Sequence, residues 1–251
     1  MKISIITITY NSAETVEETI QSVLSQDYPD IEYIIVDGKS KDNTIQIIEK
    51  YNDKISKVVS EKDNGLYDAL NKGIRLCTGD VIGMLHSDDV YYNSEVLSKV
   101  AAAFKQHPEA GAVYGDLIFV ERFNLNSIKR VWRSGLYKEG SFAKGWMPPH
   151  PTFFVRKSVY DKYGVFNTDL KLAADYELML RLIHVKKVKP VYLPIMIVKM
   201  RMGGVSNFSV ALKWKAHLED RKAWALNGMQ PSLQLLRKPL SKLFQYFQRS
   251  E

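Results

Sequence analysis

Short apolar runs alternate with helical patterns along the N-terminal part of the chain, and this alternation restricts the fold more than any other feature. The runs are rich in β-branched residues and almost continuously apolar, which is typical of strands covered on both faces. Between them lie helical patterns that begin after Asn or Asp residues, which favour helix N-termini. Strands are predicted at residues 3–8, 31–36, 55–60 and 81–85. The pattern predicts an α/β fold with a mostly parallel sheet and helices on both faces.

The regular alternation loosens after residue 94. A helix is predicted at 95–107, strands at 111–120 and 128–132, and a further helix at 173–185. A loop rich in Gly, Pro and aromatic residues, 140–152, is long enough to suggest a functional role. The extended segment 188–199 carries two prolines, which argues for an edge strand or a connector. Two helices are expected in the tail: 210–226, with Trp214, Leu218 and Ala225 on one side, and the amphipathic 240–248.

Composition excludes several classes of protein. The chain of 251 residues has the hydrophobic and charged fractions of a globular protein, 45% and 25%. Its single cysteine, Cys77, excludes an internal disulfide and is expected to be a small core residue in a reducing compartment. No apolar stretch approaches the roughly 20 residues of a membrane span, so a cytoplasmic protein is expected. The net charge of +7 comes without any nucleic-acid-binding motif, and no nucleic-acid partner is predicted.

Carboxylates follow two of the predicted strands. Asp37 comes directly after 31–36, and the pair Asp88 and Asp89 comes just after 81–85. In open α/β sheets, ligands bind outside the carboxyl ends of the strands. Adjacent carboxylates repel each other unless a cation or hydrogen bonds hold them, and oxygen ligands suit Mg²⁺ or Mn²⁺. The pair therefore indicates a metal-bound diphosphate, although Asp residues also occur in solvated turns.

Three further polar sites have two interpretations each. Asp68 and Lys72 lie on one face of the helix at 67–77, where they can reach a nucleotide or simply form an i,i+4 ion pair in solvent. Asp175 lies at the start of the helix predicted at 173–185. It can serve there as a general base, or it can simply be a carboxylate that the helix dipole stabilises. His150 lies in the proline-flanked loop, and no His or Cys at ligand spacing accompanies it. Spacing alone does not decide among these alternatives.

In combination, these motifs resemble family 2 glycosyltransferases, whose catalytic fold is called GT-A. The resemblance covers about residues 1–205 and is strongest to the branch that builds bacterial exopolysaccharide, capsule and O-antigen units. It implies a GT-A catalytic domain at 1–206, with a nucleotide-binding half at 1–92 and an acceptor-side half at 93–206, and a helical C-terminal extension at 207–251. The motifs are Thr9-Tyr10-Asn11, Val36-Asp37-Gly38, Asp63-Asn64-Gly65, Ser87-Asp88-Asp89, His150-Pro151-Thr152, Asp175-Tyr176-Glu177 and Gly203-Gly204-Val205-Ser206.

The resemblance assigns a role to each matching residue. On the donor side, Thr9 and Asn11 would line the nucleotide pocket, Asp37 would hold the base or ribose, and Asp68 would help close the pocket. Because Ser87 stands at the first carboxylate position of the metal motif, Asp89 becomes the expected ligand of Mn²⁺ or Mg²⁺. Asp88 would contact the ribose or donor sugar, and Lys72 would add positive charge. Asp175 would be the catalytic base, and His150 and Glu177 are acceptor-side candidates.

The expected activity is inverting transfer of one sugar from a nucleoside-diphosphate sugar to a saccharide acceptor, and the resemblance implies a lipid-linked acceptor. A UDP-sugar is favoured and a GDP-sugar is the alternative. The Gln-any-any-Arg-Trp motif of processive members is absent. Two alternatives to this activity are a nucleotidyltransferase and a catalytically silent scaffold of the same fold. A nucleotidyltransferase would require a glycine-rich, basic loop after the first strand, and a silent scaffold would not need the carboxylates.

Residues 233–249 are predicted to lie on the inner face of the cell membrane, or to pack on the domain or a second subunit. The oligomeric state stays open.

Overall fold

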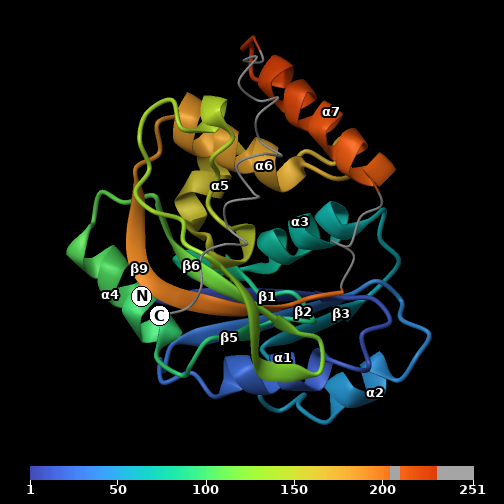
Figure 1. Ribbon diagram of the computed structural model, residues 1–251. Coiled ribbons are helices and arrows are strands. Elements are labelled where there is room, and N and C mark those ends of the chain that lie inside the picture. Colours follow the sequence, from blue (N-terminus) through green and yellow to red (C-terminus); the bar gives the residue numbers. More distant parts are fainter. Residues whose placement is uncertain (204–209, 231–251) are drawn as a thin grey trace.

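The computed structural model describes residues 1–203 and 210–230 as a mixed α/β fold built on one large sheet (Figure 1). Among these residues the strand order is β3-β2-β1-β4-β8-β6-β9-β5, with β7 paired to β6. The first four strands pair in parallel, which confirms the parallel sheet predicted from the N-terminal alternation. They are β1 (Ile3–Thr9), β2 (Ile31–Asp37), β3 (Lys57–Ser60) and β4 (Val81–Met84).

Helices cover both faces of this parallel half, as predicted. Successive side chains of β2 point to opposite faces: Tyr33 and Ile35 join one buried cluster, whereas Ile34 and Val36 join the other. The first cluster packs under α1, α2 and α4, and the second under α3, α5 and α6 (Figure 1). The helix bounds are α1 (Val16–Leu24), α2 (Thr44–Glu49), α3 (Leu66–Leu76), α4 (Val96–Gln106), α5 (Lys157–Tyr163) and α6 (Ala174–Met179).

The second half of the sheet is mixed. Strand β8 (Phe154–Arg156) lies between β4 and β6 (Ala112–Glu121) and is antiparallel to both. Strand β6 also forms a hairpin with β7 (Asn124–Trp132). The two-residue strand β5 (Val90–Tyr91) closes the far side of the sheet. Strand β5 directly follows the Asp88-Asp89 loop, so the second half of the sheet continues from the expected donor site.

Two predicted elements differ from the observed ones. Segment 188–199 is no connector but the twelve-residue strand β9 (Pro190–Arg201), parallel to β6 and flanked by β5 at one end. Its Pro194 lies where the pairing with β6 shifts register, so no ladder hydrogen bond is lost there. The helix predicted at 173–185 is α6 followed by a π-helical turn, Leu180–Val185. Two short turns, Phe142–Lys144 and His150–Thr152, interrupt the loop at 140–152.

The C-terminal helix α7 (Val210–Leu226) has the predicted bounds, but the side that carries Leu218 and Ala225 is not the one that it buries. Its buried side chains include Asp220, Ala223 and Trp224, whereas Leu218 is 51% exposed. Polar residues of α7 find hydrogen-bond partners on the domain, so hydrophobic spacing did not identify the contact face. Among residues 1–203 and 210–230 no helix combines the length and apolarity of a membrane span. The helix predicted at 240–248 and the segment 233–249, for which membrane contact is one expectation, lie outside the described residues.

Cys77 belongs to the core, as predicted. Its side chain is buried in the cluster beneath α3 and is not part of a disulfide. Burial raises the pKa of the Cys77 thiol to about 12, so the reactive thiolate is scarcely populated at neutral pH. This thiol has no part in the site described next.

Candidate active site

The Asp37 carboxylate is buried at the carboxyl end of β2. It accepts hydrogen bonds from Thr9 Oγ1 at 3.0 Å and from Ser60 Oγ at 2.7 Å, at the ends of the two neighbouring strands. The N–H and the hydroxyl of Ser40 also donate to it, at 3.1 and 2.5 Å. A buried carboxylate with four donors is well satisfied. Asp37 therefore fixes the three loops that follow β1, β2 and β3 relative to one another.

The loop after β1 is fastened to the loop after β2 at Asn11. Asn11 adopts a left-handed φ of 50°, which Asn tolerates better than most residues. Its N–H donates to Ser40 Oγ at 2.9 Å, and its Oδ1 accepts from the N–H of Lys41 at 2.8 Å. These bonds leave the neighbouring Tyr10 ring 60% exposed. A single aromatic residue in a loop carries no periodic signal, so the sequence pointed to no role for Tyr10 beyond its place in the motif Thr9-Tyr10-Asn11.

Asp68 and Lys72 both contact the loop that precedes α3. Asp68 Oδ2 accepts from the backbone N–H of Asn64 at 2.9 Å. Lys72 Nζ lies 2.9 Å from Glu61 Oε1 and 3.7 Å from Asp68 Oδ2. The two residues thus share one helix face, as predicted, and there they form the i,i+4 pair of the alternative interpretation. Their contacts shape the loop at 61–65, where the N–H of Glu61 donates to the backbone oxygen of Asp37.

Arg201, the last residue of β9, holds the Asp88-Asp89 loop. Its Nη1 donates to the backbone oxygen of Asp88 at 2.7 Å, and its N–H donates to Asp89 Oδ1 at 3.1 Å. The guanidinium also pairs with Glu18 of α1. Asp89 is 1% exposed, and its Oδ2 has no hydrogen-bond partner among the described residues. Burial and then the neighbouring charge of Asp88 raise the pKa of Asp89 well above its ordinary value.

A chain of side-chain contacts runs from this loop to Asp175. His86 Nε2 lies 3.1 Å from His150 Nε2, and His150 Nδ1 lies 3.4 Å from Asp175 Oδ2. On the other side, the Tyr67 hydroxyl donates to Asp175 Oδ1 at 3.3 Å. Burial and then His150 lower the pKa of His86 to about 4, so this imidazole is neutral at pH 7. His150 therefore has the histidine partner that sequence spacing did not reveal.

The model for the family described as "Glycosyl transferase family 2" matches residues 4–164, which is more than half of the chain. The chain belongs to glycosyl transferase family 2. This confirms the predicted family and GT-A fold, and the protein is a glycosyltransferase.

Curated relatives agree with this assignment. A PGL/p-HBAD biosynthesis glycosyltransferase from Mycobacterium bovis is 27% identical over 208 residues, which cover 81% of this chain and 78% of the relative. An uncharacterized glycosyltransferase from Mycobacterium tuberculosis is 30% identical over 71% of this chain and 68% of its own length. A third, from Rickettsia prowazekii, is 29% identical over 87% of this chain and 69% of its own length.

Solved structures share the fold at lower sequence identity. S. aureus TarS in complex with UDP-GlcNAc superposes with a TM-score of 0.68 and 21% identity, over 97% of this chain and 73% of that structure. The mannosyltransferase PcManGT from Pyrobaculum calidifontis, in complex with GDP-Man and Mn²⁺, has a TM-score of 0.67 and 19% identity, over 98% of this chain and 69% of that structure. At these identities the likeness establishes the fold alone.

Glu177 of the glycosyltransferase is buried in the packing of α6. Its carboxylate is 4% exposed and accepts from Arg181 Nε at 2.9 Å and from Asn227 Nδ2 at 3.0 Å. The same arginine donates to the backbone oxygen of Val165 at 2.7 Å. Glu177 and Arg181 thus join α6 to α7 and to the loop after α5. These contacts account for Glu177 as a structural residue, which differs from its expected position on the acceptor side.

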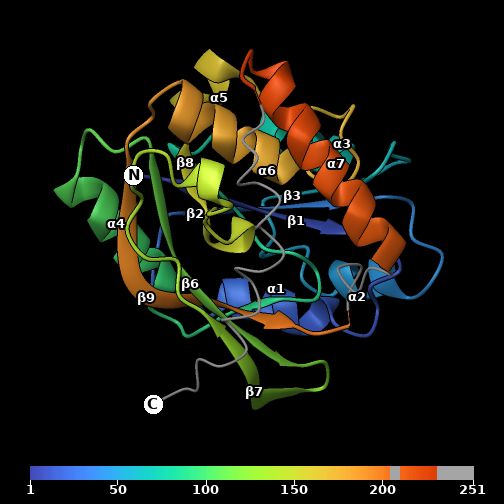
Figure 2. The same cartoon turned by 45° about the horizontal axis from the view of Figure 1, so that its top comes forward.

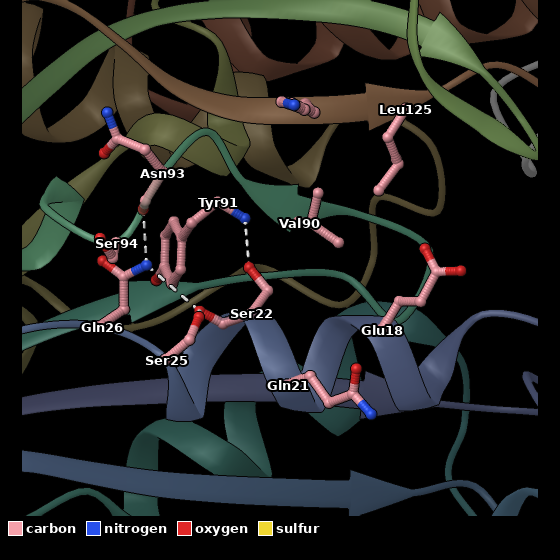
Figure 3. A pocket seen from close by; sticks show the side chains of 11 residues that line it. Glu18, Gln21, Ser22, Ser25, Gln26, Val90, Tyr91, Asn93, Ser94 and Leu125 are labelled. Atoms are coloured by element: carbon pink, nitrogen blue, oxygen red, sulfur yellow. Dashed lines mark hydrogen bonds between the residues drawn. The ribbon is translucent and has the colours of Figure 1, made fainter.

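A cavity of about 610 Å³ lies elsewhere on the glycosyltransferase, between α1 and β5 (Figure 3). Polar side chains of α1 line it together with Leu125 and Lys199, and the Tyr91 N–H donates to Ser22 Oγ at 2.7 Å on its wall. None of the predicted site residues lines this cavity. It is therefore separate from Asp37 and from Asp175.

Gly38 allows two loops of the expected donor pocket to pack together. A Cβ at this position would lie 2.5 Å from Asp63 Oδ2. Gly38→Ala should displace Asp63 and weaken nucleotide binding about tenfold. This factor corresponds to about 1.4 kcal/mol of binding free energy, the size expected for the strain that the added methyl group causes. Isothermal titration with UDP and GDP measures this change, and thermal unfolding provides the control for the fold. Unchanged affinity would mean that the Asp63 loop does not contact the nucleotide.

Proposed function

We propose that this glycosyltransferase transfers one sugar from a nucleoside-diphosphate sugar to a saccharide acceptor, with inversion at the anomeric carbon. The observation that carries the proposal is the contact chain from the Asp88-Asp89 loop through His86 and His150 to Asp175. It joins a loop suited to a diphosphate with a carboxylate suited to take a proton. The proposed acceptor is a lipid-linked saccharide of surface polysaccharide synthesis. One relative is named as a PGL/p-HBAD biosynthesis glycosyltransferase, which is consistent with a role in glycan synthesis.

On the acceptor side, Asp175 is the proposed catalytic base. Its Oδ1 is held by the N–H of Tyr176 at 2.8 Å and by the Tyr67 hydroxyl at 3.3 Å. Its Oδ2 lies toward His150 and takes the proton of the acceptor hydroxyl. The acceptor oxygen then forms the glycosidic bond as the bond between the anomeric carbon and the diphosphate breaks. Tyr67 and His150 keep the carboxylate in place during this step, and positioning of this kind is worth several orders of magnitude in rate.

On the donor side, the loops fixed by Asp37 form the proposed nucleotide pocket. Thr9 and Asn11 line it, and the exposed Tyr10 ring offers a face on which a base can stack. Asp88, which is partly exposed, is proposed to contact the ribose or donor sugar. The neighbours were solved with UDP-GlcNAc and with GDP-Man, so both bases are compatible with this fold. UDP remains the proposed base and GDP the alternative.

Asp89 fits a divalent cation. Its Oδ2 is buried without a hydrogen-bond partner among the described residues, and a cation would supply the missing partner. The described residues contain no group of three or more His, Cys, Asp or Glu side chains arranged around a metal. Most ligands would then come from diphosphate oxygens and water, which is usual for Mg²⁺ at phosphate sites. Mn²⁺ or Mg²⁺ bound here would neutralise charge on the departing diphosphate.

A thermal-shift panel tests the donor half of the proposal. UDP, GDP, CMP and their sugar conjugates are each added with and without Mn²⁺. A ligand at 100 times its Kd stabilises the folded state by about 2.7 kcal/mol, so UDP or GDP with Mn²⁺ should raise the melting temperature by several degrees. CMP serves as the mismatched control. A folded protein that shifts with none of these ligands would contradict a sugar-nucleotide donor and favour a silent member of the family.

A further inference from the structure

The C-terminal helix α7 contacts the segment that carries the proposed base. In both views α7 lies against α6 on the outer side of the molecule (Figures 1 and 2). Glu219 Oε2 accepts the N–H of Leu172 at 2.7 Å and the N–H of Ala173 at 3.1 Å. Ala173 is the N-cap residue of α6, and Asp175 lies in the first turn. The backbone directly before Asp175 is therefore anchored by a side chain from a different helix.

This anchor adds a contact that no side chain of α6 supplies, to the N–H groups of Leu172 and Ala173. Helix N-termini leave backbone N–H groups without intrahelical partners, and Ser, Thr, Asp or Asn at the N-cap usually satisfies one of them. Here the N-cap is Ala173, which has no side-chain acceptor, and α6 has no side-chain cap. Glu219 brings a carboxylate to the start of α6, where the positive end of the helix dipole also favours negative charge. Without this carboxylate, α6 loses its external anchor at the turn that presents Asp175.

Two more contacts hold α7 on the residues after Asp175. Trp224 Nε1 donates to the Tyr176 hydroxyl at 2.9 Å, and Asn227 Nδ2 donates to Glu177 Oε1 at 3.0 Å. Helix α7 and the residue that follows it thus bind residues on both sides of Asp175, whose own carboxylate contacts His150, the Tyr67 hydroxyl and the Tyr176 N–H. Burial, then the charge of Asp175, and also that of Glu219 raise the pKa of Tyr67, whose hydroxyl donates to Asp175.

We propose that Glu219 is a positioning residue for the base: by accepting the N–H groups of Leu172 and Ala173, it fixes the turn of α6 that aims Asp175 at the acceptor hydroxyl. On this proposal α7 is a working part of the active site and not an appendage to the catalytic domain. The inference rests on the proposed function, in which Asp175 takes the acceptor proton.

The test compares Glu219→Ala, Glu219→Gln and the control Trp224→Phe in the full-length chain. Glu219→Ala should lower kcat about 10- to 100-fold, because misplacement of a reacting group by about 1 Å costs up to 10²-fold. The KM for the donor should change less than about twofold, since the donor pocket is untouched. Glu219→Gln should recover most of kcat, because the amide oxygen can accept both N–H groups. Trp224→Phe loosens α7 at Tyr176 and should lower the melting temperature while kcat stays within about twofold.

Three outcomes would overturn the inference. They are an unchanged kcat in Glu219→Ala, a Glu219→Gln variant as slow as Glu219→Ala, and a Trp224→Phe variant that loses as much kcat as Glu219→Ala. The last would mean that any loosening of α7 slows transfer. Asp175→Asn is assayed alongside. If Asp175→Asn remains active, Asp175 is not the base, whatever the result for the Glu219 variants. If Asp175→Asn is inactive while Glu219→Ala keeps its activity, the role of Glu219 is refuted and the base assignment stands.

Discussion

Asp175→Asn should lower the rate of sugar transfer by about 10²- to 10⁴-fold, the range that a positioned general base contributes. The amide cannot take the acceptor proton. It can still accept the hydrogen bonds that the Tyr176 N–H and the Tyr67 hydroxyl donate to Asp175 Oδ1. The fold and the donor pocket should therefore persist. The variant separates loss of proton transfer from loss of structure.

The measurement is transfer of label from the donor that the thermal-shift panel identifies to acceptors in a membrane-lipid extract. Donor binding by the variant should stay within about threefold of the native value, a difference of less than 1 kcal/mol. Asp161→Asn is the matched control, because Asp161 is 60% exposed on α5 and forms a surface ion pair with Lys157. Native transfer rates in Asp175→Asn would refute the base assignment. Equal losses in both variants would point to a general effect on the fold.

Asp89→Asn should abolish the metal-dependent part of nucleotide binding and lower transfer at least about 10²-fold, as loss of a major electrostatic contact to a transition state typically does. The asparagine Oδ1 can still accept the N–H of Arg201, which Asp89 Oδ1 accepts at 3.1 Å. The loop should thus keep its position while the charge that would hold a cation is gone. Melting curves with UDP or GDP, recorded with and without Mn²⁺, measure the effect.

Asp80→Asn provides the comparison for Asp89→Asn. Asp80 lies just before β4, at the opposite end of that strand, where its Oδ2 accepts the N–H of Lys2 at 2.8 Å. Its replacement should leave the metal-dependent shift intact. If Asp88→Asn removes the shift while Asp89→Asn retains it, the cation is held by the more exposed carboxylate and the assignment to Asp89 is incorrect.

Much of the fold was predictable because its signals are local. Apolar runs of strand length and helical periodicity repeat within a few residues, so the parallel strands, α1 to α4 and the bounds of α7 follow from the sequence. Strand β9 was harder to predict, because its two prolines are unfavourable in a ladder. Pro194 is accommodated only by a register shift against β6. The short strands β5 and β8 are stabilised by pairing with distant strands, and no periodic pattern marks them.

The sequence by itself determined the fold class, the family and the carboxylates that bear the proposed chemistry, because Asp37, Asp88, Asp89 and Asp175 stand at strand ends or a helix start within recognisable motifs. Only the tertiary structure decided which side chains support them. His86 and His150 are 64 positions apart, and Glu219 lies 46 positions from Ala173. Such pairs depend on how whole elements pack, and packing brings together residues whose relation no local spacing encodes. The same packing assigned Glu177 to the core and made α7 a neighbour of the base.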